Sequence, residues 1–242
     1  MAFLCLAIPT MKRWKFLKQN LPVMLERPEV TEIVICDETG EDIDEIQKSS
    51  FYPNPKLKLF KNEKRLGIYQ NKRKALSLAT APWVAIIDSD NTFPESWFER
   101  LDEVIKQQDN QKMIYGSAIF QSINVTTGAV QKNCESFEGT LLDKKSWNQM
   151  IGRYKWNFLL NDGNWVVHKS AIDFLPEKVL EGYEGGAQYC DAIYSLRLLI
   201  QAGYSIWYVP ELSYIHTVHD ESSWLTTERA STIAFNTTNW YI

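Results

Sequence analysis

The sequence has few cysteines, no glycine-rich loop and no long apolar run. Its four cysteines are scattered, with no Cys-x-x-Cys spacing and no Cys/His cluster, which argues against a zinc module and a disulfide framework. The glycine spacings of P-loop and dinucleotide-binding proteins are also absent. No stretch approaches the roughly 20 apolar residues that cross a bilayer, and the first residues lack a signal-peptide pattern. We therefore expect a cytoplasmic protein without a transmembrane segment, with a peripheral membrane contact left open.

Charge and aromatic residues are each concentrated in one part of the chain. Residues 56–74 contain eight basic residues and one acidic residue, a local +7, within a chain whose net charge is −4. The rest of the chain therefore carries about −11. Residues 137–242 hold 18 of the 31 aromatic residues. An acidic chain with one basic segment is not typical of a nucleic-acid-binding protein, so the segment points instead to a small anionic ligand.

Apolar runs alternate with helical patterns, most regularly in the first half. Strands are expected at residues 3–8, 30–36, 56–60, 83–87, 113–120, 164–168 and 204–209. Helices are expected at residues 14–25, 41–48, 67–78 and 187–201. This alternation predicts the α/β class, with a mostly parallel central sheet and helices on both faces.

Two carboxylates directly follow the strand expected at 83–87. In an open parallel sheet, ligands bind beyond the carboxyl ends of the strands. Asp88 and Asp90 would lie at such an end, next to a buried strand. An unpaired charge in that position is costly because it is partly removed from water. A divalent cation held by carboxylates and substrate phosphates would offset that cost. The alternative is a turn in which Asn91 starts the next helix. A second Asp-x-Asp, at Asp42 and Asp44, lies in an acidic helix and is interpreted as a solvated face.

The basic segment comes just before this strand. Arg65 and Lys72, with Arg73 as a further candidate, are expected to bind phosphate from a loop and the first turns of a helix. Lys56 and Lys58 alternate outward on their strand and are expected at the surface.

Several segments occur in an order that is typical of one enzyme family. The first strand ends in Pro9-Thr10, the second is Val34-Ile35-Cys36-Asp37, a helix contains Asn71-Lys72-Arg73-Lys74-Ala75-Leu76, and the fourth strand leads into Asp88-Ser89-Asp90. Later come Asn164-Trp165, Cys190-Asp191 with Arg197 on the same helix, and Tyr214-Ile215-His216. Over residues 3–220 the chain thereby resembles the GT-A fold glycosyltransferases, specifically the family-2-like group with a DxD motif.

The resemblance implies a role for each segment. Pro9, Thr10, Asp37, Arg65, Lys72, Asp88, Ser89 and Asp90 would bind the nucleotide-sugar, with Asp37 at the nucleobase, Asp88 at the ribose and Lys72 at the diphosphate. Asp90 and His216 would hold the metal, with His219 as the alternative to His216. Asn164 and Trp165 would line the acceptor, and Asp191 would be the catalytic base. Cys190 stands where the family usually has Glu.

The resemblance also implies a fold, a cofactor and an activity. The fold would be a single Rossmann-like GT-A domain over 1–242, with a donor half at about 1–110, an acceptor half at about 111–225 and a C-terminal tail at 226–242. The activity would be metal-dependent transfer from a nucleotide-sugar, a UDP-sugar, to a glycan or glycoconjugate hydroxyl with inversion. Mn²⁺ is preferred and Mg²⁺ is possible, because imidazole with carboxylate suits Mn²⁺. A retaining transferase and a non-catalytic glycan-binding module stay open.

Overall fold

The computed structural model describes residues 3–133, 137–151, 160, 163–220 and 223–242. Its strands are β1 (Leu4–Thr10), β2 (Val30–Asp37), β3 (Leu57–Lys61), β4 (Trp83–Ile86), β5 (Met113–Asn124), β6 (Val130–Asn133), β7 (Leu141–Leu142), β8 (Trp165–His168) and β9 (Ser205–Val218). Its helices are α1 (Trp14–Glu26), α2 (Glu41–Lys48), α3 (Ile68–Ser77), α4 (Glu95–Gln108), α5 (Lys144–Met150), α7 (Glu184–Tyr189), α8 (Asp191–Gln201) and α9 (Ser223–Thr237). A 3-10 helix, η1 (Lys169–Phe174), follows β8.

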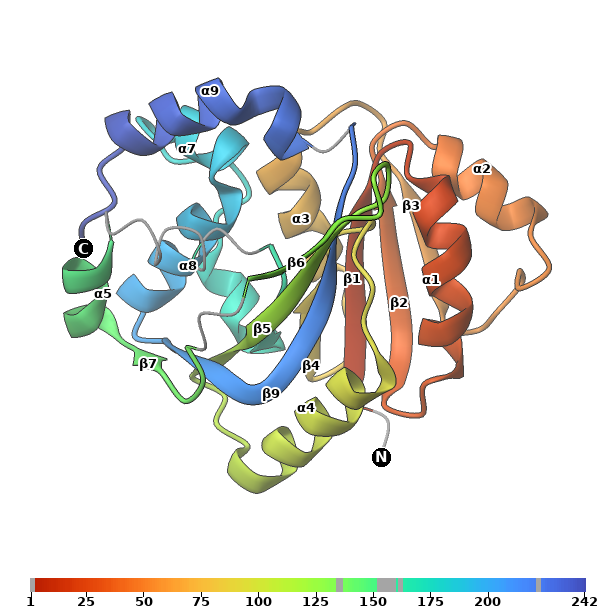
Figure 1. Ribbon diagram of the computed structural model, residues 1–242, viewed down its shortest axis with the longest axis horizontal. Coiled ribbons are helices and arrows are strands. Elements are labelled where there is room, and N and C mark those ends of the chain that lie inside the picture. The colour runs from red at the N-terminus through yellow and green to blue at the C-terminus, as the bar shows by residue number, and fades with distance from the viewer. Residues whose placement is uncertain (1–2, 134–136, 152–159, 161–162, 221–222) are drawn as a thin grey trace.

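A single sheet in the order β3-β2-β1-β4-β8-β5-β9-β7 runs through the molecule, and β6 pairs with β5. The four strands from β3 to β4 are parallel. β8 is antiparallel to both β4 and β5, whereas β5 and β9 are parallel to each other. Helices cover both faces of this mostly parallel sheet (Figure 1). The predicted α/β architecture is confirmed.

β1 alternates between two hydrophobic cores. Cys5 and Ala7 pack in the core that includes residues of α3 and α8, whereas Leu4, Leu6 and Ile8 pack in the core that includes residues of α1 and α4. Each of these five side chains is at most 1% exposed. A strand covered by helices on both faces needs no polar face, which is why its sequence is an unbroken apolar run.

The carboxyl ends of the parallel strands bring the predicted site residues to one edge. Thr10 at the end of β1 lies opposite Asp37 at the end of β2. β4 ends two residues before Asp88, and its last residue pairs with Trp165 at the start of the antiparallel β8. The edge therefore gathers ends of β1, β2 and β4 with the beginning of β8.

Two elements differ from the sequence prediction. The strand expected at 204–209 continues past Pro210 to Val218, because Glu211 adopts a φ of 66° and the register with β5 shifts between Ser117 and Ile119. The helix expected at 187–201 is interrupted at Cys190, where φ is −136° and ψ is 44°. Asp191 is consequently the first residue of a separate helix, α8.

The interpretation of Asp42 as part of a solvated face is wrong. Asp42 is 1% exposed, whereas Asp44 on the same helix is exposed. The Asp42 carboxylate accepts hydrogen bonds from Thr10 Oγ1 at 2.6 Å and from the Arg13 backbone N–H at 2.8 Å, so it is buried against the loop after β1. Within the described ranges, no helix has the length and apolar character needed to cross a membrane.

Candidate functional site

The loop after β4 is fixed to the segment before β8. The Asp88 backbone N–H donates to Asn164 Oδ1 at 3.0 Å, and Asn164 is buried. Asn164, which was predicted to line the acceptor, therefore holds the turn that carries Asp88-Ser89-Asp90. The adjacent Trp165 ring is 5% exposed and packs in the core with α3 and α8 residues, so its predicted acceptor contact stays a prediction.

A buried ammonium joins two of the predicted carboxylates. Lys72 Nζ lies 2.9 Å from Asp88 Oδ1 and 2.8 Å from Asp191 Oδ2. The exposed fraction of the Lys72 side chain is 14%. Burial by itself would lower the pKa of Lys72, but the charges of Asp191 and Asp88 and their hydrogen bonds outweigh it and raise the pKa. Lys72 is therefore charged at neutral pH, and it links the end of β4 to the start of α8.

The second carboxylate of the run, Asp90, lies between two cationic or ionisable groups. His219 Nε2 is 3.0 Å from Asp90 Oδ2, and Arg13 Nε is 3.7 Å from the same oxygen. Burial opposes ionisation of Asp90, but the His219 hydrogen bond and the charges of His219, Arg13 and His216 lower its pKa. His219 is 2% exposed and its ring lies 4.7 Å from the Phe16 ring. The Asp90 carboxylate is therefore ionised and faces inward.

His216 lies within electrostatic reach of the same carboxylates. Burial lowers the pKa of His216, and the charges of Asp90 and Asp88 oppose that shift. His219 Nε2 also contacts one of these carboxylates, at 3.0 Å from Asp90 Oδ2. Metal binding by His216 stays a prediction, with His219 as the alternative.

The donor set at Asp90 fits a divalent cation in part. A carboxylate oxygen and an imidazole nitrogen 3.0 Å apart can both be ligands of one ion, and these two ligand types suit Mn²⁺. Among the residues that the structure describes, no three His, Cys, Asp or Glu side chains form a metal-binding group. Such an ion would therefore need further oxygen ligands, which substrate phosphates commonly supply.

Asp37 has a structural role at the end of β2. Its side chain is fully buried, and its oxygens accept hydrogen bonds from the backbone N–H groups of Thr39, Asp42 and Ile43. Two of these groups belong to the first turn of α2, so Asp37 satisfies donors that a helix start leaves unpaired. Contact between Asp37 and a nucleobase stays a prediction, and it would require some of these bonds to be released.

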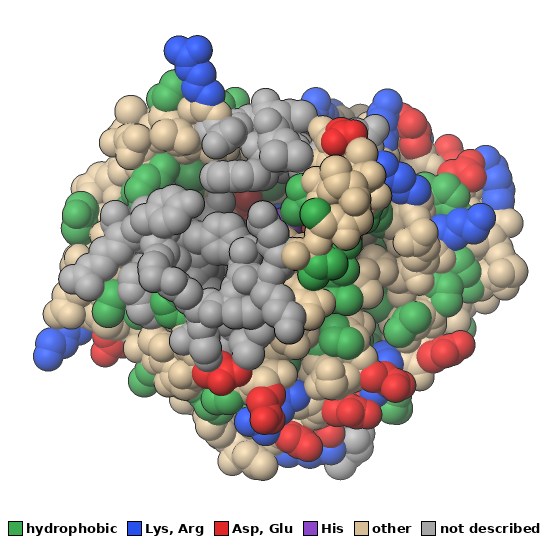
Figure 2. Space-filling view, viewed as in Figure 1, with side chains coloured by type: hydrophobic (Ala, Val, Ile, Leu, Met, Phe, Trp, Pro, Cys, Tyr) green, Lys and Arg blue, Asp and Glu red, His purple; other side chains and the backbone are tan. Residues whose placement is uncertain are grey.

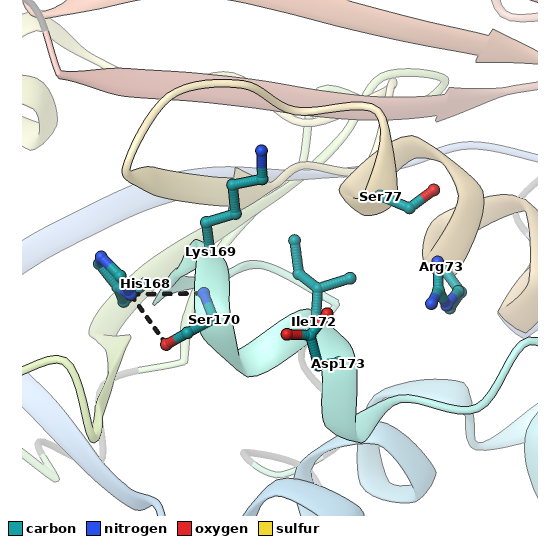
Figure 3. A pocket seen from close by; sticks show the side chains of 7 residues that line it. All are labelled: Arg73, Ser77, His168, Lys169, Ser170, Ile172 and Asp173. Atoms are coloured by element: carbon teal, nitrogen blue, oxygen red, sulfur yellow. Dashed lines mark hydrogen bonds between the residues drawn. The ribbon is translucent and has the colours of Figure 1, made fainter.

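The two arginines predicted to bind phosphate have surroundings that differ from those of Lys72. Arg65 is exposed on the loop between β3 and α3. Glu38 fixes this loop, because its carboxylate accepts hydrogen bonds from the backbone N–H groups of Leu66 and Gly67 at 2.7 and 2.9 Å. Arg73 Nε donates to the Leu175 carbonyl at 3.0 Å. Arg73 also lines a cavity of about 340 Å³ with His168, Lys169 and Asp173 (Figure 3). Because His168 pairs with Trp83 at the start of β4, this cavity is at the opposite end of β4 from Asp88.

Sequence reasoning missed Arg13 and gave His219 second place. Arg13 lies in the loop between β1 and α1. This loop follows the carboxyl end of the first strand, where ligands bind in such sheets, and that position was a signal that the Arg13 side chain could reach the site. His219 directly follows β9, whose extension past Pro210 carries it to Asp90. That extension depends on a bulge, for which the sequence has no clear local signal.

The fold and this edge site define a Rossmann-like α/β protein whose charged side chains gather where such sheets bind nucleotides. The sequence matches the glycosyl transferase family 2 model over residues 5–170. The chain belongs to glycosyl transferase family 2, as its resemblance to GT-A enzymes predicted. No curated protein matches the sequence significantly.

Solved structures share the fold at low sequence identity. S. aureus TarS 1–349 in complex with UDP-GlcNAc has a TM-score of 0.64 and 15% identity, over 92% of this chain and 60% of that chain. The same protein in complex with UDP has a TM-score of 0.63 and 14% identity, over 99% of this chain and 67% of that chain. GalNAc-T7 with UDP, GalNAc and Mn²⁺ has a TM-score of 0.62 and 16% identity, over 90% of this chain and 44% of that chain. The chain thus has the fold of these proteins, and it spans between 44% and 67% of their chains.

Proposed function

We propose that this chain is a metal-dependent glycosyltransferase that moves a sugar from a UDP-sugar to a hydroxyl of a glycan or glycoconjugate acceptor. One observation carries the proposal: Asp90 with His219, and Lys72 with Asp88 and Asp191, converge at the carboxyl edge of the sheet in a family 2 chain. The solved relatives with UDP, UDP-GlcNAc and Mn²⁺ support this choice of donor and metal.

The donor would lie between the loop after β1 and the loop after β4. Asp90 and His219, with His216 nearby, would hold the divalent cation, which when bound supplies positive charge to a departing diphosphate. Lys72 and Arg13 add fixed positive charge on the two sides of the Asp88-Ser89-Asp90 run. Fixed cations placed where the diphosphate gains charge lower the barrier to its departure. Pro9, Thr10, Asp37 and Arg65 are proposed donor contacts around this centre.

Asp191 would accept the proton of the attacking hydroxyl. It is the first residue of α8, where the helix dipole favours a carboxylate, and its side chain is 16% exposed. Attack from the face opposite the leaving diphosphate, with Asp191 as the general base, gives inversion. Asn164 and Trp165 are proposed neighbours of the acceptor. NMR of the product's anomeric proton tests this step, because a retained configuration would exclude Asp191 as the base of a direct displacement.

Nucleic acid is not a proposed partner. Basic and acidic side chains are mixed over the regions of α2 and α4 on the face seen in Figure 2, so the described residues of that face form no extended basic surface. Within residues 56–74, Lys72 is the cation that pairs with Asp88 and Asp191, and we propose it as the contact to a diphosphate.

The proposal is tested by calorimetric titration of UDP in the presence of Mn²⁺ or EDTA. We expect Mn²⁺ to strengthen binding in the wild type, and Asp90→Ala to weaken the Mn²⁺-dependent binding by at least about tenfold because it removes a charged ligand. Asp44→Ala is the matched control, because Asp44 belongs to the other Asp-x-Asp and is exposed on α2. Absence of metal-linked UDP binding in the wild type would overturn the proposal and favour the glycan-binding alternative.

A further inference from the structure

Lys72 joins carboxylates that come from distant parts of the chain. Asp88 belongs to the loop after β4 and Asp191 begins α8, yet both lie within 3 Å of the same Lys72 nitrogen. An ammonium has three N–H donors, so the two carboxylates leave one donor for another acceptor. Lys72 can therefore hold both carboxylates and still contact a phosphate.

Gly163 lies directly beside Asp88 and Lys72, and its lack of a side chain leaves space for them. A Cβ atom placed on Gly163 would lie 2.3 Å from Asp88 Oδ2 and 2.8 Å from Lys72 Nζ, distances that real Cβ atoms do not reach. Gly163 is not among the glycines with a left-handed φ, so the requirement here is for space and not for backbone conformation. Any side chain at this position would displace Asp88, Lys72 or the backbone before β8.

We propose that Lys72 is a positioning residue. By binding both Asp88 and Asp191, it fixes the position of the Asp191 carboxylate, the proposed base, relative to the donor site. Gly163 has no side chain, which leaves space for Lys72 and Asp88. The inference rests on the proposed function, in which Asp191 is the base. It adds a second task to the phosphate contact expected of Lys72. The raised pKa of Lys72 is consistent with this task, because both carboxylates stabilise its charged form.

The kinetic test uses UDP release from UDP-GlcNAc with Mn²⁺, with water in place of the acceptor. We expect Gly163→Ala to lower kcat by about 100-fold, since small displacements of reacting groups cost rates of this size, and we expect the accompanying rise in the KM for UDP-GlcNAc to be smaller than this factor. Lys72→Met should lower kcat at least as much, and Lys72→Arg should restore part of it because a guanidinium can still bind both carboxylates.

The matched control for Gly163→Ala is Gly185→Ala. Gly185 has no left-handed φ, and a Cβ there would meet Ala234 Cβ at 3.7 Å, an ordinary contact. We expect Gly185→Ala to keep kcat near the wild-type value. Gly163→Ala or Lys72→Met with near-normal kcat, in a wild type that does release UDP, would overturn the inference alone. A wild type that shows neither Mn²⁺-linked UDP binding nor release of UDP from a panel of UDP-sugars would overturn the proposed function and this inference with it.

A second readout needs no donor. Lys72→Met leaves two partly buried carboxylates without their cation, so we expect it to lower the urea midpoint, and we expect Asp191→Asn added to Lys72→Met to recover part of the loss. Additive effects of the two substitutions would show that Lys72 and Asp191 do not interact, and would overturn the inference. Coupled effects together with a selective loss of kcat in Gly163→Ala support it.

Discussion

At the scale of single residues, carboxylates have different roles at the two ends of the sheet. At the carboxyl end, Asp88, Asp90 and Asp191 each form an ion pair with a cationic or ionisable side chain, and their side chains remain partly exposed. At the other end, Glu32 on β2 is 3% exposed and accepts from Lys58 Nζ, from Thr80 and from the Ala81 backbone N–H. The first group can exchange partners with substrate, whereas Glu32 has all its partners within the fold.

Glu32 should make stability depend on acid pH. Burial opposes its ionisation, but hydrogen bonds from Lys58, Ala81 and Thr80 lower its pKa from 4.5 to about 2. Because the folded pKa is the lower one, this stabilisation is present above about pH 4.5 and is lost as the pH falls toward 2, and its full size is about 3 kcal/mol. Urea denaturation at pH 6 and pH 3 should show a smaller pH-dependent loss in Glu32→Gln than in the wild type. Glu103→Gln, on the exposed side of α4, should leave the loss unchanged.

At the scale of elements, helix starts position the site. α8 starts at Asp191 because Cys190 leaves the helical region, and α2 starts where Asp37 accepts from two N–H groups of its first turn. Asp42 of α2 then binds Thr10 and Arg13, so the loop that brings Arg13 to Asp90 depends on α2. The first turn of α2 is therefore coupled to the donor site through Asp42.

Removal of the Asp37 carboxylate should cost stability even without ligand. Asp37→Ala leaves buried N–H groups of α2 without acceptors, and we expect a loss of about 2 kcal/mol in the free energy of unfolding. Thermal or urea unfolding of the free protein measures it, with Asp44→Ala as the control on the same helix. If Asp37→Ala weakened UDP binding but left stability intact, Asp37 would act through the nucleobase and not through α2.

At the scale of the whole molecule, the sequence predicts the sheet better than the site. The apolar runs of β1, β2 and β4 and the helical segments between them predict parallel strands with a common carboxyl edge, because burial on both faces leaves a local signal. The Asp88–Lys72 and Asp90–His219 contacts, the burial of Asp42 and the passage of β9 through Pro210 depend on partners far along the chain. Resemblance to a family supplied Lys72, Asp88 and Asp90 as candidates, whereas the contact between His219 and Asp90 becomes visible only in the fold.

The C-terminal tail, for which the sequence offers no motif, packs against the helices that carry the proposed base. The end of the chain lies beside α5 (Figure 1), where Trp147 Nε1 donates to the Trp240 carbonyl at 2.8 Å. Arg197 of α8 donates to the Tyr241 carbonyl at 2.9 Å. The Trp240 ring is 3% exposed, and it lies so close to Gly186 of α7 that a Cβ there would be 2.7 Å from it. The tail thus ties α5, α7 and α8 together.

Trp240→Ala should therefore destabilise the half of the molecule that carries Asp191. Removing a buried Trp ring costs about 3 kcal/mol or more, and the loss should appear in urea unfolding. Hydrogen exchange should rise in α7 and α8, which the tail covers, more than in β1 and β2, which lie in the other half of the sheet. Tyr241→Ala is the control, because the Tyr241 side chain is 60% exposed and only its backbone carbonyl binds Arg197. Equal exchange in both halves after Trp240→Ala would mean that the tail stabilises the whole fold and does not selectively support the helix of the proposed base.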